Sequence, residues 1–143
     1  MTSSSLADRL GGEKTLPRDV QSDLELADAV RSGLSYSAVE HVIERGMLLP
    51  AEVYELVGSR RSLDRKKKED RVLSPVESDR LARVARLIGR AEEALGDRDA
   101  AHRWLRKQNR ALGGRRPLDL LASDIGARTV EQALGRIEHG VHS

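Results

Sequence analysis

The segment from Ser74 to Leu95 constrains the fold most, because it carries both a helix start signal and a long helical apolar pattern. Ser74 is a good N-cap, Pro75 suits the first helical position, and Glu77 stands where a capping box needs a carboxylate. The apolar residues that follow recur at helical spacing until Gly96, at Leu81, Val84, Ala85, Ile88, Ala91 and Leu95. This segment is therefore predicted to form a long amphipathic helix.

The rest of the chain shows helical preferences too. Its 143 residues include no Phe, one Trp and two Tyr, whereas strands favour aromatic and β-branched residues. Shorter helices are predicted over 23–32 and 99–107. Other short helices are expected to begin at cap or first-turn residues, namely Ser35 or Ser37, Pro50, Ser59 and Pro117. A last helix is expected over the apolar series Val130, Ala133, Leu134, Ile137 and Val141. In the first, we expect four residues to face inward: Leu24, Leu26, Ala27 and Val30. The expected fold class is all-α.

Composition divides the chain into three expected parts. Residues 1–22 show little apolar periodicity, so we expect a mobile N-terminal arm there. Residues 23–73 are predicted to form a helix-turn-helix and dimerisation domain, and residues 74–143 a second helical domain. Without cysteine, a signal-peptide pattern or an apolar run of ~20 residues, the protein is expected in the cytoplasm and not in a membrane.

A basic segment follows an acidic one. Residues 1–58 carry 5 basic and 10 acidic residues, whereas residues 59–71 carry 7 and 3. A short helix ending at Gly58, a tight turn and a basic helix beginning at Arg60 give the outline of a helix-turn-helix. The second helix of that motif lies in the major groove, with its N-terminal residues nearest the bases. We therefore predict DNA contacts from Ser59, Arg60, Arg61, Ser62, Arg65 and Lys66.

The expected contacts differ in kind. Arginine bonds guanine through two acceptors, which favours Arg61 and Arg65 for bases, while four other cations are better placed for phosphates: Lys66, Lys67, Lys68 and Arg71. Three carboxylates oppose tight binding because each repels phosphate: Asp64, Glu69 and Asp70. The alternative interpretation is a solvated surface helix with no DNA role.

Catalytic and cofactor motifs are missing from the sequence. The four histidines (His41, His102, His139 and His142) lack cysteine partners and HExxH spacing. The Gly113-Gly114-Arg115-Arg116 string lacks the strand before it and the Lys-Ser/Thr after it that a phosphate loop has. We expect no enzymatic activity, no cofactor and no metal, and so a protein that acts by binding.

Several strings in the C-terminal half carry a family resemblance. Trp104-Leu105, Asn109, ALGGRRPLDLL (111–121) and GARTVEQALGRIEHGV (126–141) are similar to the toxin-binding domain of Xre-type antitoxins, the MbcA/ParS-like partners of RES-domain toxins. Residues 33–88 resemble the helix-turn-helix half of these antitoxins, so the likeness covers roughly Asp23 to His142. Two positions depart from the family pattern: Arg110 stands where proline is common, and His139 where an aromatic residue is common.

The resemblance implies a type II antitoxin with defined partners. RES toxins consume NAD, and their antitoxins dimerise, bind the toxin with the C-terminal domain and obstruct the NAD pocket. The complex commonly binds its own operator DNA. The implied partners are thus a RES-domain toxin, operator DNA and a second copy in a homodimer or a larger hetero-oligomer with toxin. The matching positions are Trp104, Asn109, Leu112, Gly113, Gly114, Arg115, Pro117, Leu118, Gly126, Val130, Leu134, Ile137, Glu138 and Gly140.

In this C-terminal half, side-chain chemistry suggests which residues pack in the core and which contact the toxin. Core roles are expected for Trp104, Leu118, Leu121 and Leu134. Gly113 and Gly114 permit a turn with positive φ before Pro117. The predicted toxin-binding set is Trp104, Asn109, Leu112, Gly113, Gly114, Arg115, Arg116, Arg136, Glu138, His139, Gly140, Val141, His142 and Ser143. Two alternatives stay open: a free-standing DNA-binding regulator whose C-terminal domain dimerises, and an assembly adaptor without a DNA role.

Overall fold

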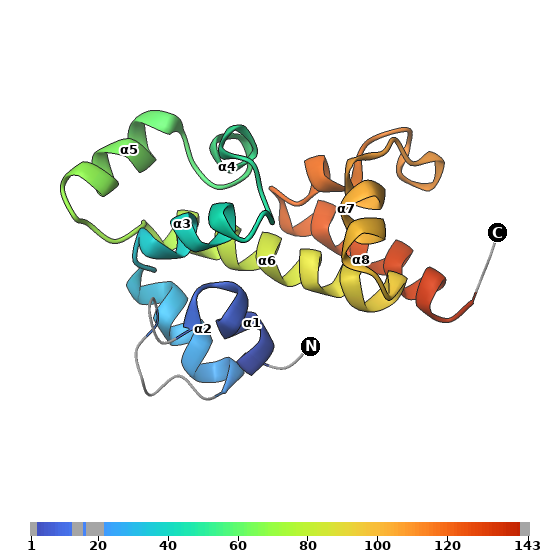
Figure 1. The fold of residues 1–143 in the computed structure, drawn as a ribbon, viewed down its shortest axis with the longest axis horizontal. Helices are drawn as coiled ribbons and strands as arrows, with labels where there is room; N and C mark the ends of the chain where they lie inside the picture. Colours follow the sequence, from blue (N-terminus) through green and yellow to red (C-terminus); the bar gives the residue numbers. More distant parts are fainter. Residues whose placement is uncertain (1–2, 13–15, 17–21, 141–143) are drawn as a thin grey trace. The chain divides into compact units, whose positions relative to one another are not determined.

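The structure, a computed structural model, describes residues 3–12, 16 and 22–140 of the chain. Within these residues the regular elements are all helical (Figure 1). In chain order they are α1 (Ser3–Arg9), α2 (Asp23–Ser32), α3 (Ser37–Glu44), α4 (Pro50–Leu56), α5 (Arg60–Lys68), α6 (Pro75–Leu95), α7 (Arg98–Arg106), the 3-10 helices η2 (Arg110–Leu112) and η3 (Pro117–Leu120), and α8 (Asp124–Glu138). The all-α prediction is confirmed.

The chain divides into two compact units, residues 1–85 and 86–143, and α6 begins in the first and ends in the second. We expected the boundary at the start of this helix. It lies further along because the first turns of α6 bond to the first unit: Ser78 Oγ accepts the Leu34 N–H at 2.8 Å. The predicted capping box is present, since Ser74 Oγ accepts the Glu77 N–H at 3.1 Å and Glu77 accepts the Ser74 N–H at 2.9 Å.

The N-terminal part departs from prediction. The expected arm contains a helix, α1, which packs against α2, and Ala7, Leu10 and Leu16 are buried. Leu24 is 75% exposed, so the expectation that it faces inward is wrong, and Ala27 is exposed as well. Leu26 supplies the buried position of α2 instead. Residues two apart lie about 200° apart around a helix, so burying Leu26 turns Leu24 outward.

The second unit has an aliphatic core between α7, η3 and α8. Leu118, Leu121 and Leu134 are buried as predicted, and η3 packs on both α7 and α8. The turn at Gly113 and Gly114 has φ values of +69° and +79°, which confirms the positive-φ turn before Pro117. Two ion pairs join the end of α6 to α8, Arg86 with Glu131 and Arg90 with Glu138.

None of the described helices is long and apolar enough to cross a lipid bilayer. The same residues contain no group of three or more His, Asp or Glu side chains that could hold a metal ion.

Candidate functional site

The basic helix α5 begins and packs as the sequence predicts. Ser59 is its N-cap, and its hydroxyl accepts the Ser62 N–H at 3.1 Å. Leu63 is fully buried and anchors the helix, while Arg60, Arg61 and Arg65 are exposed. With α4 ending at Leu56 just before it, the helix-turn-helix outline is present.

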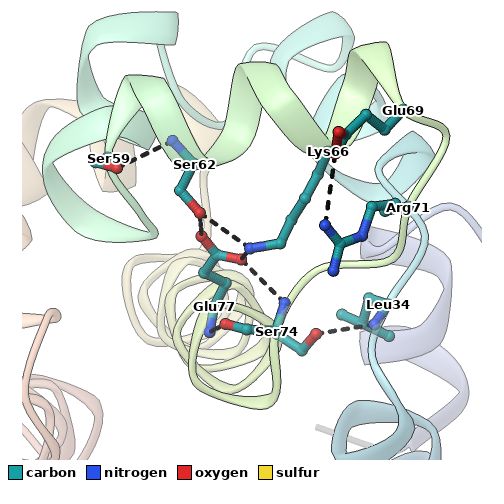
Figure 2. Close-up of polar contacts among 9 residues, drawn as sticks. Leu34, Ser59, Ser62, Lys66, Glu69, Arg71, Ser74 and Glu77 are labelled. Carbon is teal, nitrogen blue, oxygen red and sulfur yellow. Dashed lines mark hydrogen bonds and ion pairs between the residues drawn. The ribbon is translucent and has the colours of Figure 1, made fainter.

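A polar cluster anchors one side of α5 to the start of α6 (Figure 2). Glu77 is only 6% exposed, and its carboxylate accepts hydrogen bonds from Ser62 Oγ at 2.6 Å, from Lys66 Nζ and from the Ser74 N–H. Burial opposes ionisation of Glu77, but these hydrogen bonds outweigh it and lower its pKa from 4.5 to about 2. Lys66 also donates to Ser62 Oγ at 2.9 Å, so the three side chains form one closed network.

Gly58 leaves the space that this network needs. A Cβ atom at this position would lie 2.7 Å from Glu77 Oε2, closer than a carbon and an oxygen approach without bonding. A side chain at this position would displace the Glu77 carboxylate, so glycine favours the network between α5 and α6.

Both tyrosines of the protein hold α5 from another side. The Tyr54 hydroxyl donates to Asp64 Oδ1 at 3.1 Å, and the Arg60 guanidinium lies 4.9 Å from the centre of the Tyr54 ring. Lys67 Nζ lies 5.8 Å from the centre of the Tyr36 ring. These contacts restrict the rotation of α5 about Leu63 and orient Arg60 and Asp64.

Four basic residues of this segment surround a concavity of about 350 Å³, which is lined by Ser59, Arg61, Ser62, Arg65, Lys66 and Arg71. Five of the six predicted DNA-contact residues lie here, and Arg60 lies on the tyrosine side. Lys66 and Ser62, however, both bond to Glu77, so the positive charge of Lys66 is partly compensated, and its contact with phosphate stays a prediction. The side chains of Arg61 and Arg65 have no hydrogen-bond or ion-pair partner among the described residues.

A second candidate surface lies in the loop between α7 and η3. Asn109 closes this loop, because its N–H donates to the Arg115 carbonyl at 3.1 Å and its carbonyl accepts the Gly114 N–H at 2.9 Å. Its side chain accepts the Ala111 N–H at 2.9 Å. Leu112 is buried and Trp104 is half-buried, whereas Gly113, Gly114 and Arg115 are exposed. Within the predicted toxin-binding set, Asn109 and Leu112 thus shape the loop that presents Arg115.

Ion pairs separate the other predicted toxin-binding residues into two groups. Arg116 pairs with Asp119 through two hydrogen bonds of 2.9 and 2.7 Å, and Glu138 pairs with Arg90 through two of 2.8 and 2.9 Å. Their charges are compensated within the unit. The exposed remainder at the end of α8 consists of Arg136, His139 and Gly140. Val141, His142 and Ser143 lie outside the described residues.

Comparison with known proteins identifies both units. A family model described as the antitoxin Xre-like helix-turn-helix domain matches residues 25–86, and one described as the antitoxin Xre/MbcA/ParS C-terminal toxin-binding domain matches residues 90–140. Antitoxin Xre of Yersinia enterocolitica is 33% identical over 82% of this chain and 81% of its own length. The chain belongs to the Xre antitoxin family.

Other relatives agree with this assignment. Antitoxin Xre of Pseudomonas putida is 31% identical over 85% of this chain and 76% of its own length. A protein of Sphingobium sp. named Prs ADP-ribosylating antitoxin is 32% identical over 55% of each chain. This Xre protein is an antitoxin of a toxin–antitoxin system with a helix-turn-helix domain, as the resemblance implied. The two matched regions also meet close to the end of the first unit, at residue 85.

Sequence reasoning missed part of the site around α5 of this Xre antitoxin. It assigned Glu77 to the capping box alone, and it gave no role to Tyr36 or Tyr54. The spacing of Ser62 and Lys66 offered a signal, because residues four apart share a helix face and the apolar Leu63 lies next to that face. That face points into the protein, so Lys66 needs a partner there.

Proposed function

We propose that this Xre antitoxin neutralises an NAD-degrading RES-domain toxin by covering its NAD pocket, and that it represses its own operon through the helix-turn-helix. The observation that carries the first part is the exposed polar surface of the family's toxin-binding domain, formed by the Arg115 loop and by Arg136 and His139 at the end of α8. These groups have the exposure that a partner surface requires, whereas most of the domain's apolar residues are used in its core.

An NAD-consuming partner is supported by the relative from Sphingobium sp. Its name links that antitoxin to ADP-ribosylation, and ADP-ribosyl transfer takes the group from NAD. A toxin of this kind binds NAD in a pocket, and an antitoxin seated on the pocket stops the reaction without chemistry of its own. We further propose that residues 140–143, which follow α8, enter that pocket.

Operator binding is supported by α5. Three exposed arginines lie on a helix that is anchored on two sides, by Glu77 and by the tyrosines. An ordered helix binds DNA with less loss of conformational freedom than a mobile one. Asp64 and Glu69 weaken the contact of a single copy, so we propose a homodimer, and a larger hetero-oligomer with toxin, that binds paired half-sites.

The decisive experiment mixes the antitoxin with the product of the adjacent gene and follows NAD. We expect the antitoxin to stop NAD loss at near-stoichiometric ratio, and a chain truncated after His139 to inhibit more weakly at an unchanged melting temperature. An Arg61→Ala/Arg65→Ala variant is the matched control, and it should neutralise fully while binding the operator more weakly. A protein that binds the operator but leaves NAD consumption untouched would instead be a free-standing regulator.

A further inference from the structure

The concavity beside α5 has an uncompensated positive charge. Lys66 contributes little of it, because its ammonium is paired with the Glu77 carboxylate at the back of the network. Arg71 lies 3.5 Å from Glu69, but their side chains are 63% and 49% exposed, and such a pair is worth little in water. Arg61, Arg65 and Arg71 therefore leave about three positive charges around one hollow, and none of the described carboxylates lines it.

The backbone at the start of α5 adds to this field. Arg61 lies in the first turn of the helix, where free N–H groups give a partial positive charge. Ser59 caps that turn and also lines the hollow. Each guanidinium group offers paired N–H donors, and three of them around one hollow match the several oxygens of a phosphate better than the two acceptors on one guanine edge.

We propose that this concavity binds one backbone phosphodiester of DNA, and that Arg61, Arg65 and Arg71 are its ligands and do not read bases. The proposal rests on operator binding proposed above and changes the roles that the sequence suggested for Arg61 and Arg65. The concavity has a volume of about 350 Å³, roughly ten times that of one water (~30 Å³), so a phosphate and its ester oxygens fit. The Lys66–Glu77 pair serves as a rigid back wall with no net charge.

If the three arginines share one phosphate, the salt dependence of DNA affinity should change in a specific way. Losing one phosphate contact lowers the slope of log affinity against log salt by ~0.9. Each single variant (Arg61→Ala, Arg65→Ala, Arg71→Ala) should therefore lose nearly that amount, and the triple variant little more. Between 50 and 200 mM salt, each variant should lose about 3.5-fold less affinity than the wild type, since fourfold salt to the power 0.9 is about 3.5. The preference for operator over unrelated DNA should not change.

The test replaces single phosphates in the DNA. Affinity of the full chain is measured on duplexes from its own promoter that carry a neutral methylphosphonate at one position at a time. We expect one position in each half-site where neutralisation weakens wild-type binding but has no effect on Arg65→Ala or Arg61→Ala. Arg60→Ala is the matched control, because it removes the same charge from the same helix turn outside the concavity. It should keep its sensitivity at that position.

Each other outcome has a separate meaning. Additive slope losses, or a change of base preference at a defined position in Arg61→Ala or Arg65→Ala, would overturn the proposal while leaving operator binding intact. Tight binding of inorganic phosphate to the wild type, lost in Arg65→Ala with DNA affinity unchanged, would overturn it in favour of a free phosphate. Absence of wild-type binding to any promoter duplex, in low salt and with toxin present, would instead refute operator binding itself.

Discussion

The buried pair of Lys66 and Glu77 should make this protein lose stability in acid, and Glu77→Gln should remove that sensitivity. The pKa of Glu77 is about 2 in the folded state against an ordinary value of 4.5. Each pKa unit is worth about 1.4 kcal/mol, so the ionised carboxylate contributes roughly 3 kcal/mol of folding free energy at neutral pH. A lowered folded pKa gives stability that is present above pH 4.5 and disappears as the pH falls toward 2.

The assay is urea denaturation at pH 7 and pH 3 in constant salt. Protonation of Glu77 alone should lower the free energy of unfolding of the wild type by about 2 kcal/mol when the pH falls from 7 to 3. Glu77→Gln cannot titrate and should lack this part of the pH dependence. At pH 7 the variant should be less stable by about 2–3 kcal/mol, because the mostly buried Lys66 ammonium loses its counter-charge.

A double-mutant cycle tests whether Lys66 is the residue that stabilises the ionised Glu77. Lys66→Met keeps the aliphatic stem and removes the charge, and in that background Glu77→Gln should lower stability by clearly less than in the wild type. Equal effects in both backgrounds would mean that the two residues do not interact. Parallel pH dependence of the wild type and Glu77→Gln would refute the assigned pKa, and with it the account of how α5 is held.

Three further perturbations test the surroundings of α5. Gly58→Ala should destabilise the protein by about 1–3 kcal/mol in thermal unfolding, because its Cβ would lie 2.7 Å from a Glu77 oxygen; an unchanged melting temperature would show that the carboxylate moves freely. Asp70→Gly should stabilise it by about 0.5–1 kcal/mol in urea denaturation, because Asp70 has a φ of +52° and glycine adopts this conformation without strain; lower stability would argue for an unrecognised contact of the Asp70 side chain. Tyr54→Phe removes the hydroxyl that holds Asp64 and should change stability by less than ~1.5 kcal/mol, while raising the amide exchange rates of α5 in NMR; unchanged rates would mean that the hydroxyl does not order the helix.

The fold and family of this Xre antitoxin could be predicted because their signals are local. The predicted helix starts at Ser59 and Ser74 depend on side chains that accept an N–H three residues further along, and the structure shows the same local signal at Asp97 and Ser123. The loop motif around Gly113 is a continuous string as well. The sites could be predicted only in outline, since the sequence alone does not distinguish Arg115, whose side chain has no partner among the described residues, from Arg116, which pairs with Asp119.

By itself, then, the sequence determined where the basic helix begins and which face of it carries charge. It did not determine which charges remain available. That depends on Glu77, which lies 11 residues beyond Lys66 on another helix, and on Tyr54, which precedes the turn. The tertiary structure alone decides that Lys66 neutralises a buried carboxylate while Arg61 and Arg65 keep their charge facing solvent. The physical reason is that a buried carboxylate requires a cationic partner within hydrogen-bond reach, and only the packing of α5 on α6 brings one there.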